Sequence, residues 1–188
     1  MSQLKVDSIV PTTGAPTGGA GGIIQSIMST NTTATGSVTC NNSSNYFDIP
    51  NMNVTITPRS ATGKIMVNFS VFGEPSVDDH RVGFRIKRAI SGGNTNFIQG
   101  EEAGSCSRYC VMPAIGYISS DKNSTPSFAS FGPYIDTPFT TSAVTYTVQV
   151  RFHEDSSGTW YYNRVVNSGT TADMERGVSH ITVAEVSG

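Results

Sequence analysis

The fold is decided by two stretches of sequence, KIMVNFSVF at residues 64–72 and TYTVQVRF at residues 145–152. In both, every second side chain is apolar, and those between are polar except Met66 and Phe72. This pattern is typical of a β-strand with one face in a core and one toward solvent. The apolar positions are Ile65, Val67, Phe69 and Val71 in the first stretch, and Tyr146, Val148, Val150 and Phe152 in the second.

Outward from these two stretches, the chain continues as short extended runs closed by clusters of Gly, Pro, Asn or Ser. No window has a helical period, so we expect two packed antiparallel sheets. A jelly roll is favoured over an immunoglobulin-like sandwich, because no Cys–Trp–Cys arrangement is present. The expected strands are residues 23–29, 46–49, 53–57, 64–72, 82–90, 95–101, 107–112, 114–118, 127–134, 144–152, 159–166 and 177–186.

The first 22 residues differ from the rest. Leu4, Val6 and Ile9 form a brief apolar alternation, and a glycine-rich stretch with almost no side chain to pack follows. Such a segment cannot build its own core. We therefore expect residues 1–22 to be an extended N-terminal arm and linker that becomes ordered on a partner, and residues 23–188 to be one β-sandwich domain.

The amino-acid composition limits the classes of binding partner that we expect for this chain. Charged residues make up only 14% of the 188 residues, the formal net charge is −2, and no basic stripe is present, which argues against nucleic acid as a partner. A surface rich in hydroxyl and amide groups suits neutral hydrogen bonds to sugars or proteins. Arg85 and Lys87 share one face of an expected strand, which we interpret as a solvated face. No signal peptide or membrane span is recognisable, so we expect folding in a cytoplasm, with the three cysteines as free thiols.

The sequence contains little that indicates a catalytic site. The three histidines, His80, His153 and His180, have no nucleophile elbow near any serine. The acidic stretches at 78–79 and 154–155 lack the spacing of a calcium loop, and the carboxylates cannot be paired from sequence into a glycosidase site. We predict a protein that is not an enzyme and that has no metal site and no cofactor.

The run Trp160, Tyr161, Tyr162, with Arg164 close behind, is the best candidate for a receptor or glycan contact. Aromatic faces stack on sugar rings, and the indole, phenol and guanidinium groups can bond to hydroxyl groups. On a strand, however, Trp160 and Tyr162 share one face, and we favour a core or interface position for them. Tyr161 points the other way and is the better residue to test for a ligand.

Five stretches together resemble the small tail-fibre or adhesin-type structural proteins of marine cyanophages and related tailed phages. They are LKVDSIVPTTG at 4–14, GGIIQSIMST at 21–30, ITPRSATGKIMV at 56–67, YTVQVRF at 146–152 and HITVAEVSG at 180–188. Residues 105–140 have no part in it. The resemblance implies a virion component, usually trimeric, whose N-terminal motif anchors it to the particle while the β-domain points outward.

The leading expectation is therefore a tail-associated virion protein that takes part in host attachment by binding. Its expected partners are further copies of itself, with a homotrimer favoured, another virion protein through Leu4, Val6 and Ile9, and a host surface glycan. The alternative is a capsid-bound decoration protein. A small polysaccharide depolymerase is the third hypothesis.

Overall fold

The computed structural model describes residues 22–33, 35–41, 45–77, 82–113, 126–152, 157–167, 169–170 and 174–186. Within these ranges the chain forms strands and no helix, as predicted. The arm residues Leu4, Val6 and Ile9 lie outside the described residues. The strands are β1 (Ile23–Asn31), β2 (Ser37–Cys40), β3 (Phe47–Ile56), β4 (Lys64–Pro75), β5 (Val82–Ile90), β6 (Thr95–Ile98), β7 (Ser127–Asp136), β8 (Val144–Phe152), β9 (Gly158–Tyr162) and β10 (Ser179–Val186).

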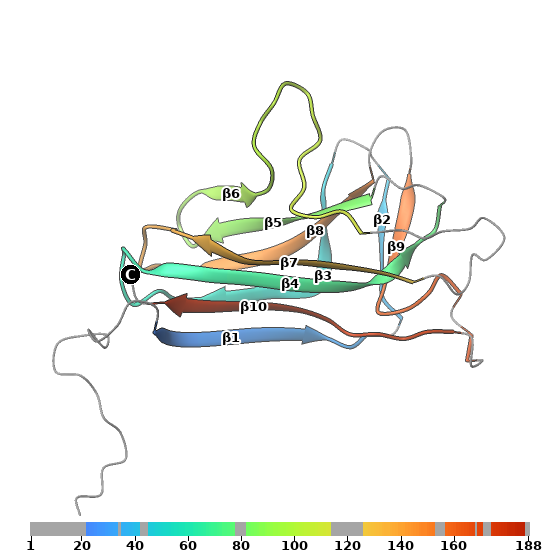
Figure 1. Cartoon of the computed structure of the whole chain (residues 1–188), viewed down its shortest axis with the longest axis horizontal. Coiled ribbons are helices and arrows are strands. Elements are labelled where there is room, and N and C mark those ends of the chain that lie inside the picture. Colours follow the sequence, from blue (N-terminus) through green and yellow to red (C-terminus); the bar gives the residue numbers. More distant parts are fainter. Residues whose placement is uncertain are drawn as a thin grey trace, which may run out of the picture.

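The strands pair in a nested series of antiparallel partners. β5 pairs with β6, β4 with β7, β3 with β8 and β1 with β10, as in one long hairpin. Rolling up this hairpin places β1-β10-β4 with β7 in one sheet and β3-β8-β5-β6 in the other. This is the connectivity of a jelly roll, which confirms the expected fold. Figure 1 shows the first sheet in front of the second.

The first sheet is extended by two further strands. β4 pairs with β10 along residues 64–70 and then with β9 at Gly73, while β9 also pairs with β2. A Cβ atom at Gly73 would lie 2.2 Å from the carbonyl oxygen of Tyr161 and 2.9 Å from the Trp160 ring. Glycine is therefore required where β4 changes partner, since any side chain would push β9 away.

The core lies between the sheets and follows the predicted alternation. All eight apolar positions named for the two deciding stretches are at most 1% exposed. Trp160 from β9 meets Phe84 from β5 edge to face, with ring centroids 5.1 Å apart, and so joins the two sheets. A cluster that draws on both sheets gives the sandwich one continuous core.

Two predicted strands are a single strand in the structure. Residues 46–49 and 53–57 were expected to be separated by a turn, but β3 runs through both, with an irregularity in its pairing to β8 between Asp48 and Asn53. Pro50 has no N–H to donate, and Asn51 adopts a left-handed φ of 61°. The turn signals at these positions thus produce a bulge instead of a strand end.

Residues 107–112 were predicted to be a strand, and this is wrong. The segment only touches β5, through an isolated bridge between Phe84 and Val111. Its place is set by side chains: the Tyr109 ring covers Gly83, where a Cβ would come within 2.3 Å of it, and the Cys110 thiol donates to the carbonyl of Ile98. The predicted strand at 114–118 lies outside the described residues, and the short strand β2 was not predicted.

Two buried carboxylates hold parts of the sandwich together. Glu185 in β10 is fully buried and accepts hydrogen bonds from the backbone N–H groups of Arg59 and Ser60 and from the Gln25 amide. Asp136 in β7 accepts from Arg88 of β5 at 2.6 Å and from the Tyr146 hydroxyl of β8 at 2.7 Å. The second cluster ties one sheet to the other by charge-assisted bonds.

Candidate functional site

The aromatic run on β9 does not form an open site. Trp160 is fully buried and Tyr162 is 4% exposed, both in the core cluster. The favoured core position is therefore found, and these two side chains cannot contact a ligand at the surface. Tyr162 also packs where Gly36 leaves room, since a Cβ there would clash with its ring.

Tyr161 lies on the other side of this strand, and Arg164, which follows the strand, contacts it. The Arg164 guanidinium sits 4.2 Å from the centre of the Tyr161 ring, and it donates to the carbonyl oxygens of Val165 and Val166. Burial lowers the pKa of Arg164. Because its donors already serve the turn after β9, this pair stabilises local structure, and only Tyr161 is exposed enough to meet a ligand.

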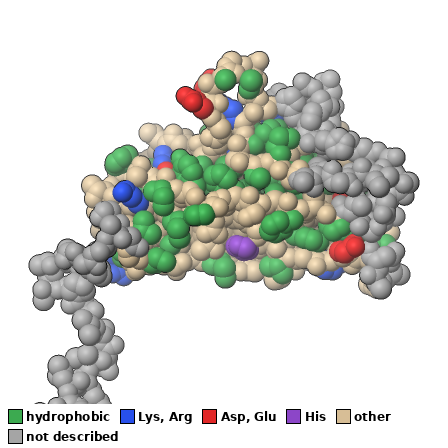
Figure 2. Space-filling view, viewed as in Figure 1, with side chains coloured by type: hydrophobic (Ala, Val, Ile, Leu, Met, Phe, Trp, Pro, Cys, Tyr) green, Lys and Arg blue, Asp and Glu red, His purple; other side chains and the backbone are tan. Residues whose placement is uncertain are grey.

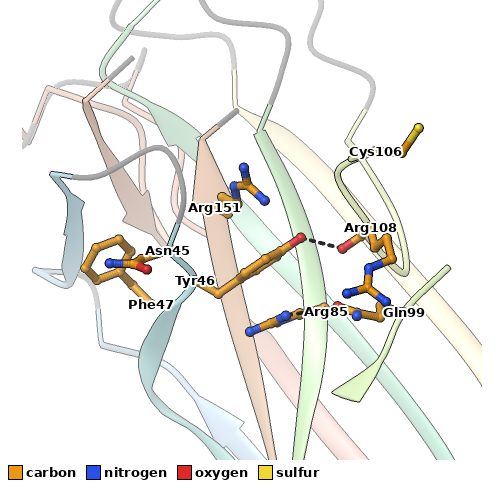
Figure 3. A pocket seen from close by; sticks show the side chains of 8 residues that line it. All are labelled: Asn45, Tyr46, Phe47, Arg85, Gln99, Cys106, Arg108 and Arg151. Atoms are coloured by element: carbon orange, nitrogen blue, oxygen red, sulfur yellow. Dashed lines mark hydrogen bonds between the residues drawn. The ribbon is translucent and has the colours of Figure 1, made fainter. Parts of the chain in front are cut away.

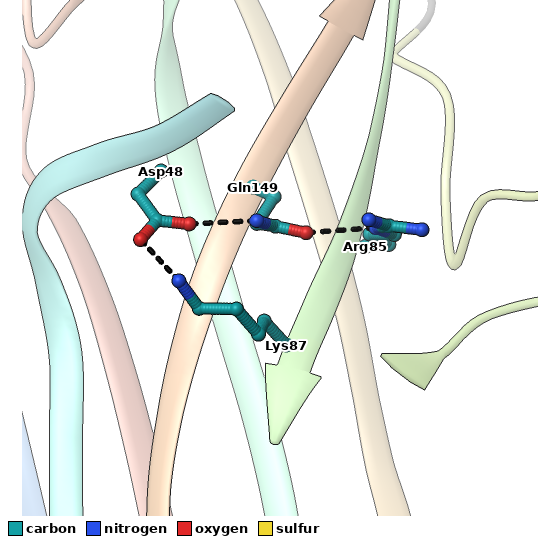
Figure 4. Close-up of polar contacts among 4 residues, drawn as sticks. All are labelled: Asp48, Arg85, Lys87 and Gln149. Atoms are coloured by element: carbon teal, nitrogen blue, oxygen red, sulfur yellow. Dashed lines mark hydrogen bonds and ion pairs between the residues drawn. The ribbon is translucent and has the colours of Figure 1, made fainter. Parts of the chain in front are cut away.

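A row of polar side chains crosses the outer face of the second sheet (Figure 4). The strand register sets Asp48 of β3 opposite Gln149 of β8, and Gln149 opposite Arg85 of β5. Gln149 donates to Asp48 at 2.7 Å and accepts from the Arg85 Nε at 2.8 Å, while Lys87 forms an ion pair with Asp48. The row fixes Arg85 and neutralises the carboxylate nearest to it.

A pocket of about 470 Å³ opens beside Arg85 at one end of this row (Figure 3). Its side chains come from four parts of the chain: the start of β3, the strand β5, the end of β8 and the segment after β6. Figure 3 shows the Tyr46 ring between the guanidinium groups of Arg85 and Arg151, with Arg108 beyond the Tyr46 hydroxyl. The lining residues are Asn45, Tyr46, Phe47, Arg85, Gln99, Cys106, Arg108 and Arg151.

Arg85 is held between two aromatic rings at the wall of this pocket. Its guanidinium carbon lies 3.4 Å from the centre of the Tyr46 ring and 3.7 Å from that of Phe97. It also donates to Gln99 at 2.9 Å, in addition to Gln149. Burial, together with the smaller effect of the nearby charges of Arg108 and Arg151, lowers the pKa of Arg85 to about 10. The group therefore keeps its positive charge at neutral pH, in a fixed orientation.

Sequence reasoning missed this pocket. It placed Arg85 and Lys87 correctly on one outward face, but as solvated charges, whereas both have fixed protein partners. The lining residues come from four separate parts of the chain between Asn45 and Arg151, and no local motif connects them. The alternation in β5 and β8 was the usable signal, because it puts Arg85, Gln149 and Arg151 on the same side of the sheet.

The outer face of the first sheet has the opposite character. The register brings its outward positions together across β1, β10, β4 and β7, and only Lys64, at one end, carries a full charge among the described ones. Figure 2 shows hydrophobic and uncharged side chains across the middle of this face, with one histidine. We call it the neutral face; its outward residues are Ser26, Met28, Thr30, Lys64, Met66, Asn68, Ser70, Phe72, Phe128, Ser130, Ile135, His180, Thr182, Ala184 and Val186.

Several of these apolar side chains are unusually exposed. Met28 is 62% exposed, Phe128 56% and Ile135 48%. At the centre of the face, His180 shares a hydrogen bond with Ser70, Nδ1 to Oγ 2.9 Å. A broad apolar and uncharged face of this kind is typical of a protein interface.

Two kinds of feature are at issue in the described part of the chain, a cluster of metal ligands and a membrane-spanning helix. This part contains no group of three His, Cys, Asp or Glu side chains that could hold a metal ion, and no helix suited to spanning a bilayer. The acidic stretches at 78–79 and 154–155, with His80 and His153, lie outside the described residues. The cysteines at 40, 106 and 110 are all free thiols, as expected.

Comparison of the sequence with protein-family models finds no match, and comparison with curated proteins finds none either.

Proposed function

We propose that this chain is a non-catalytic structural protein of a phage virion, a tail-associated adhesin that takes part in host attachment by binding. The observation that carries the proposal is the contrast between the two outer faces of the jelly roll. One is broad and neutral, and the other bears a fixed polar row and a pocket. One face is suited to assembly and the other to contact with a ligand.

The occupant proposed for the neutral face is a second copy of this chain. A charged partner would find little there to complement its charge, whereas a further copy of this chain, in which charged residues are only 14%, can present an uncharged surface to it. Met28, Phe128 and Ile135 would be covered in such an assembly. Among closed oligomers we favour the homotrimer, on the resemblance of the sequence to trimeric tail-associated proteins.

The N-terminal arm supplies the proposed attachment to the particle. The described fold starts with β1 at Ile23, so no described strand needs residues 1–21 as a partner. We expect Leu4, Val6 and Ile9 to dock on another virion protein by strand addition, with the glycine-rich stretch as a tether. Deleting residues 1–21 should leave the melting temperature within a few degrees and abolish incorporation into particles. Unfolding of the deletion variant, or its normal incorporation, would contradict the docking role.

Electron microscopy of the intact particle tests the location. Density for the jelly roll on the tail supports the proposal. Density on the head lattice would replace it with a capsid decoration protein. Release of reducing ends from a host polysaccharide by the purified chain would contradict the non-catalytic assignment.

A further inference from the structure

The pocket beside Arg85 concentrates positive charge to a degree unusual for this chain. Three of the 12 Lys and Arg residues line it, in a protein whose formal net charge is −2. Among the described residues that line it there is no Asp or Glu. Among the described carboxylates, Asp48 pairs with Lys87, and Glu102, which does not line the pocket, binds Arg108 at 3.2 Å.

The arginines are arranged for a bound anion. Arg85 is immobilised between Tyr46 and Phe97, so little side-chain entropy is lost when a ligand binds to it. Arg151 lies beside the same Tyr46 ring, 5.3 Å from its centre, and Arg108 closes the pocket from the segment after β6. Guanidinium groups recognise carboxylate and sulfate oxygens by paired hydrogen bonds.

The remaining polar groups point to a sugar as the carrier of that anion. The amides of Asn45 and Gln99 line the pocket and can donate to and accept from neutral hydroxyl groups. The volume of about 470 Å³ falls in the range of small-ligand sites. Nucleic acid would need a stripe of positive charge along its backbone, but here the charge is confined to one cavity.

We propose that the pocket of Arg85, Arg108 and Arg151 binds an acidic saccharide, a sugar that carries carboxylate or sulfate groups. The inference rests on the proposed function, because it names the ligand class of the binding face. Arg85 and Arg108 hold the anionic group, for which Arg108 exchanges its Glu102 partner. Asn45 and Gln99 bind hydroxyl groups, and Arg151 adds positive charge from the other side of the Tyr46 ring. The site differs from the aromatic run on β9.

Isothermal titration of the full chain tests the proposal with four probes of matched length: an oligogalacturonate, a sulfated galactan oligosaccharide, a neutral galactan oligosaccharide and oligo(dT). We expect binding of one or both acidic sugars, weakened by added salt. Which of the two acidic sugars binds shows whether the pocket recognises carboxylate or sulfate. Binding of neither acidic sugar, equal binding of the neutral sugar, or equal binding of oligo(dT) overturns the proposal.

Three variants locate the site. R108Q/R151Q should weaken acidic-sugar binding at least tenfold, and E102Q should strengthen it a few-fold by freeing Arg108. R59Q removes one positive charge beyond the opposite end of β3, which makes it the matched control for R108Q, and it should leave the affinity within twofold. R108Q alone, outside any strand, serves if the double variant fails to fold. An unchanged affinity in the pocket variants, or an equal loss in R59Q, overturns the proposal, whereas the oligomeric state and the particle location test the proposed function independently.

Discussion

Removing the hydroxyl of Tyr146 is the most informative change in the core. The Tyr146 hydroxyl donates to Asp136 at 2.7 Å, while Arg88 binds the other carboxylate oxygen at 2.6 Å. Asp136 is 6% exposed and Tyr146 fully buried, so water cannot replace the lost donor. Burial raises the pKa of Tyr146, and the Asp136 carboxylate raises it further, which keeps the hydroxyl protonated as a donor.

Y146F keeps the ring and its packing and deletes only this bond. A hydrogen bond to a charged group contributes about 1.5–3 kcal/mol, so we expect the free energy of unfolding to fall by ~2 kcal/mol. In a chain of this size that corresponds to a decrease of about 4–8 °C in melting temperature. R88A should cost more, ~3–5 kcal/mol, because it leaves a buried carboxylate without its cation.

Urea unfolding measures these differences, with every variant at one protein concentration so that assembly does not shift the midpoints. Y134F, on a tyrosine that is 42% exposed in the same β7, is the matched control and should change stability by less than ~0.5 kcal/mol. If Y146F were as stable as the parent, Asp136 would not depend on this donor, and the proposed tie between the sheets would be wrong.

Three further predictions concern the thiols and the second buried carboxylate. Burial raises the pKa of Cys40 and of Cys110 to about 12, so both thiols should stay protonated and unreactive at pH 8.5. Iodoacetamide at that pH should label the exposed Cys106 first and the other two only on unfolding, which peptide mass spectrometry would show. The pKa of these two thiols is near 9 in the unfolded chain and about 12 in the folded one. The free energy of unfolding should therefore be unaffected by them below about pH 9 and should fall as the pH rises from 9 to 12. C40A should make this fall less steep when unfolding is measured in urea. E185A should lower the free energy of unfolding by at least ~3 kcal/mol, because the N–H groups of Arg59 and the next residue lose their acceptor. E185Q keeps an acceptor oxygen and should lower the free energy of unfolding by less. Equal losses in the two variants would show that the charge of Glu185, not its role as an acceptor, matters.

Much of the fold could be predicted because alternation reports directly on which side of a strand faces the core. Val148 and Phe152 in β8 are buried as expected, and so is Trp160 in β9. The lengths of the strands were harder to predict than their faces. Pro50 and Asn51 are typical turn residues and predicted a break in β3, where the strand only bulges, because the pairing on either side outweighs the local turn preference.

The pocket could not be predicted, because periodicity assigns a face but not a register between strands distant in sequence. Asp48, Gln149 and Arg85 align only once β8 is known to lie between β3 and β5. Tyr46 and Arg108 meet because the segment after β6 folds back over Gly83. Neither the order of the strands nor the path of this segment can be predicted from a local sequence pattern.

The proposed assembly through the neutral face is tested most directly by sedimentation equilibrium of the full chain at micromolar concentration, with and without T182K. Thr182 lies at the centre of the neutral face, opposite Met28 and Asn68, and T55K places the same charge on the outer face of the other sheet. We predict three times 20.0 kDa for the parent and for T55K, in reducing agent as well, and 20.0 kDa for T182K, because a buried lysine there has no partner. A parent that is monomeric at every concentration, or a T182K variant that assembles like T55K, would contradict the account.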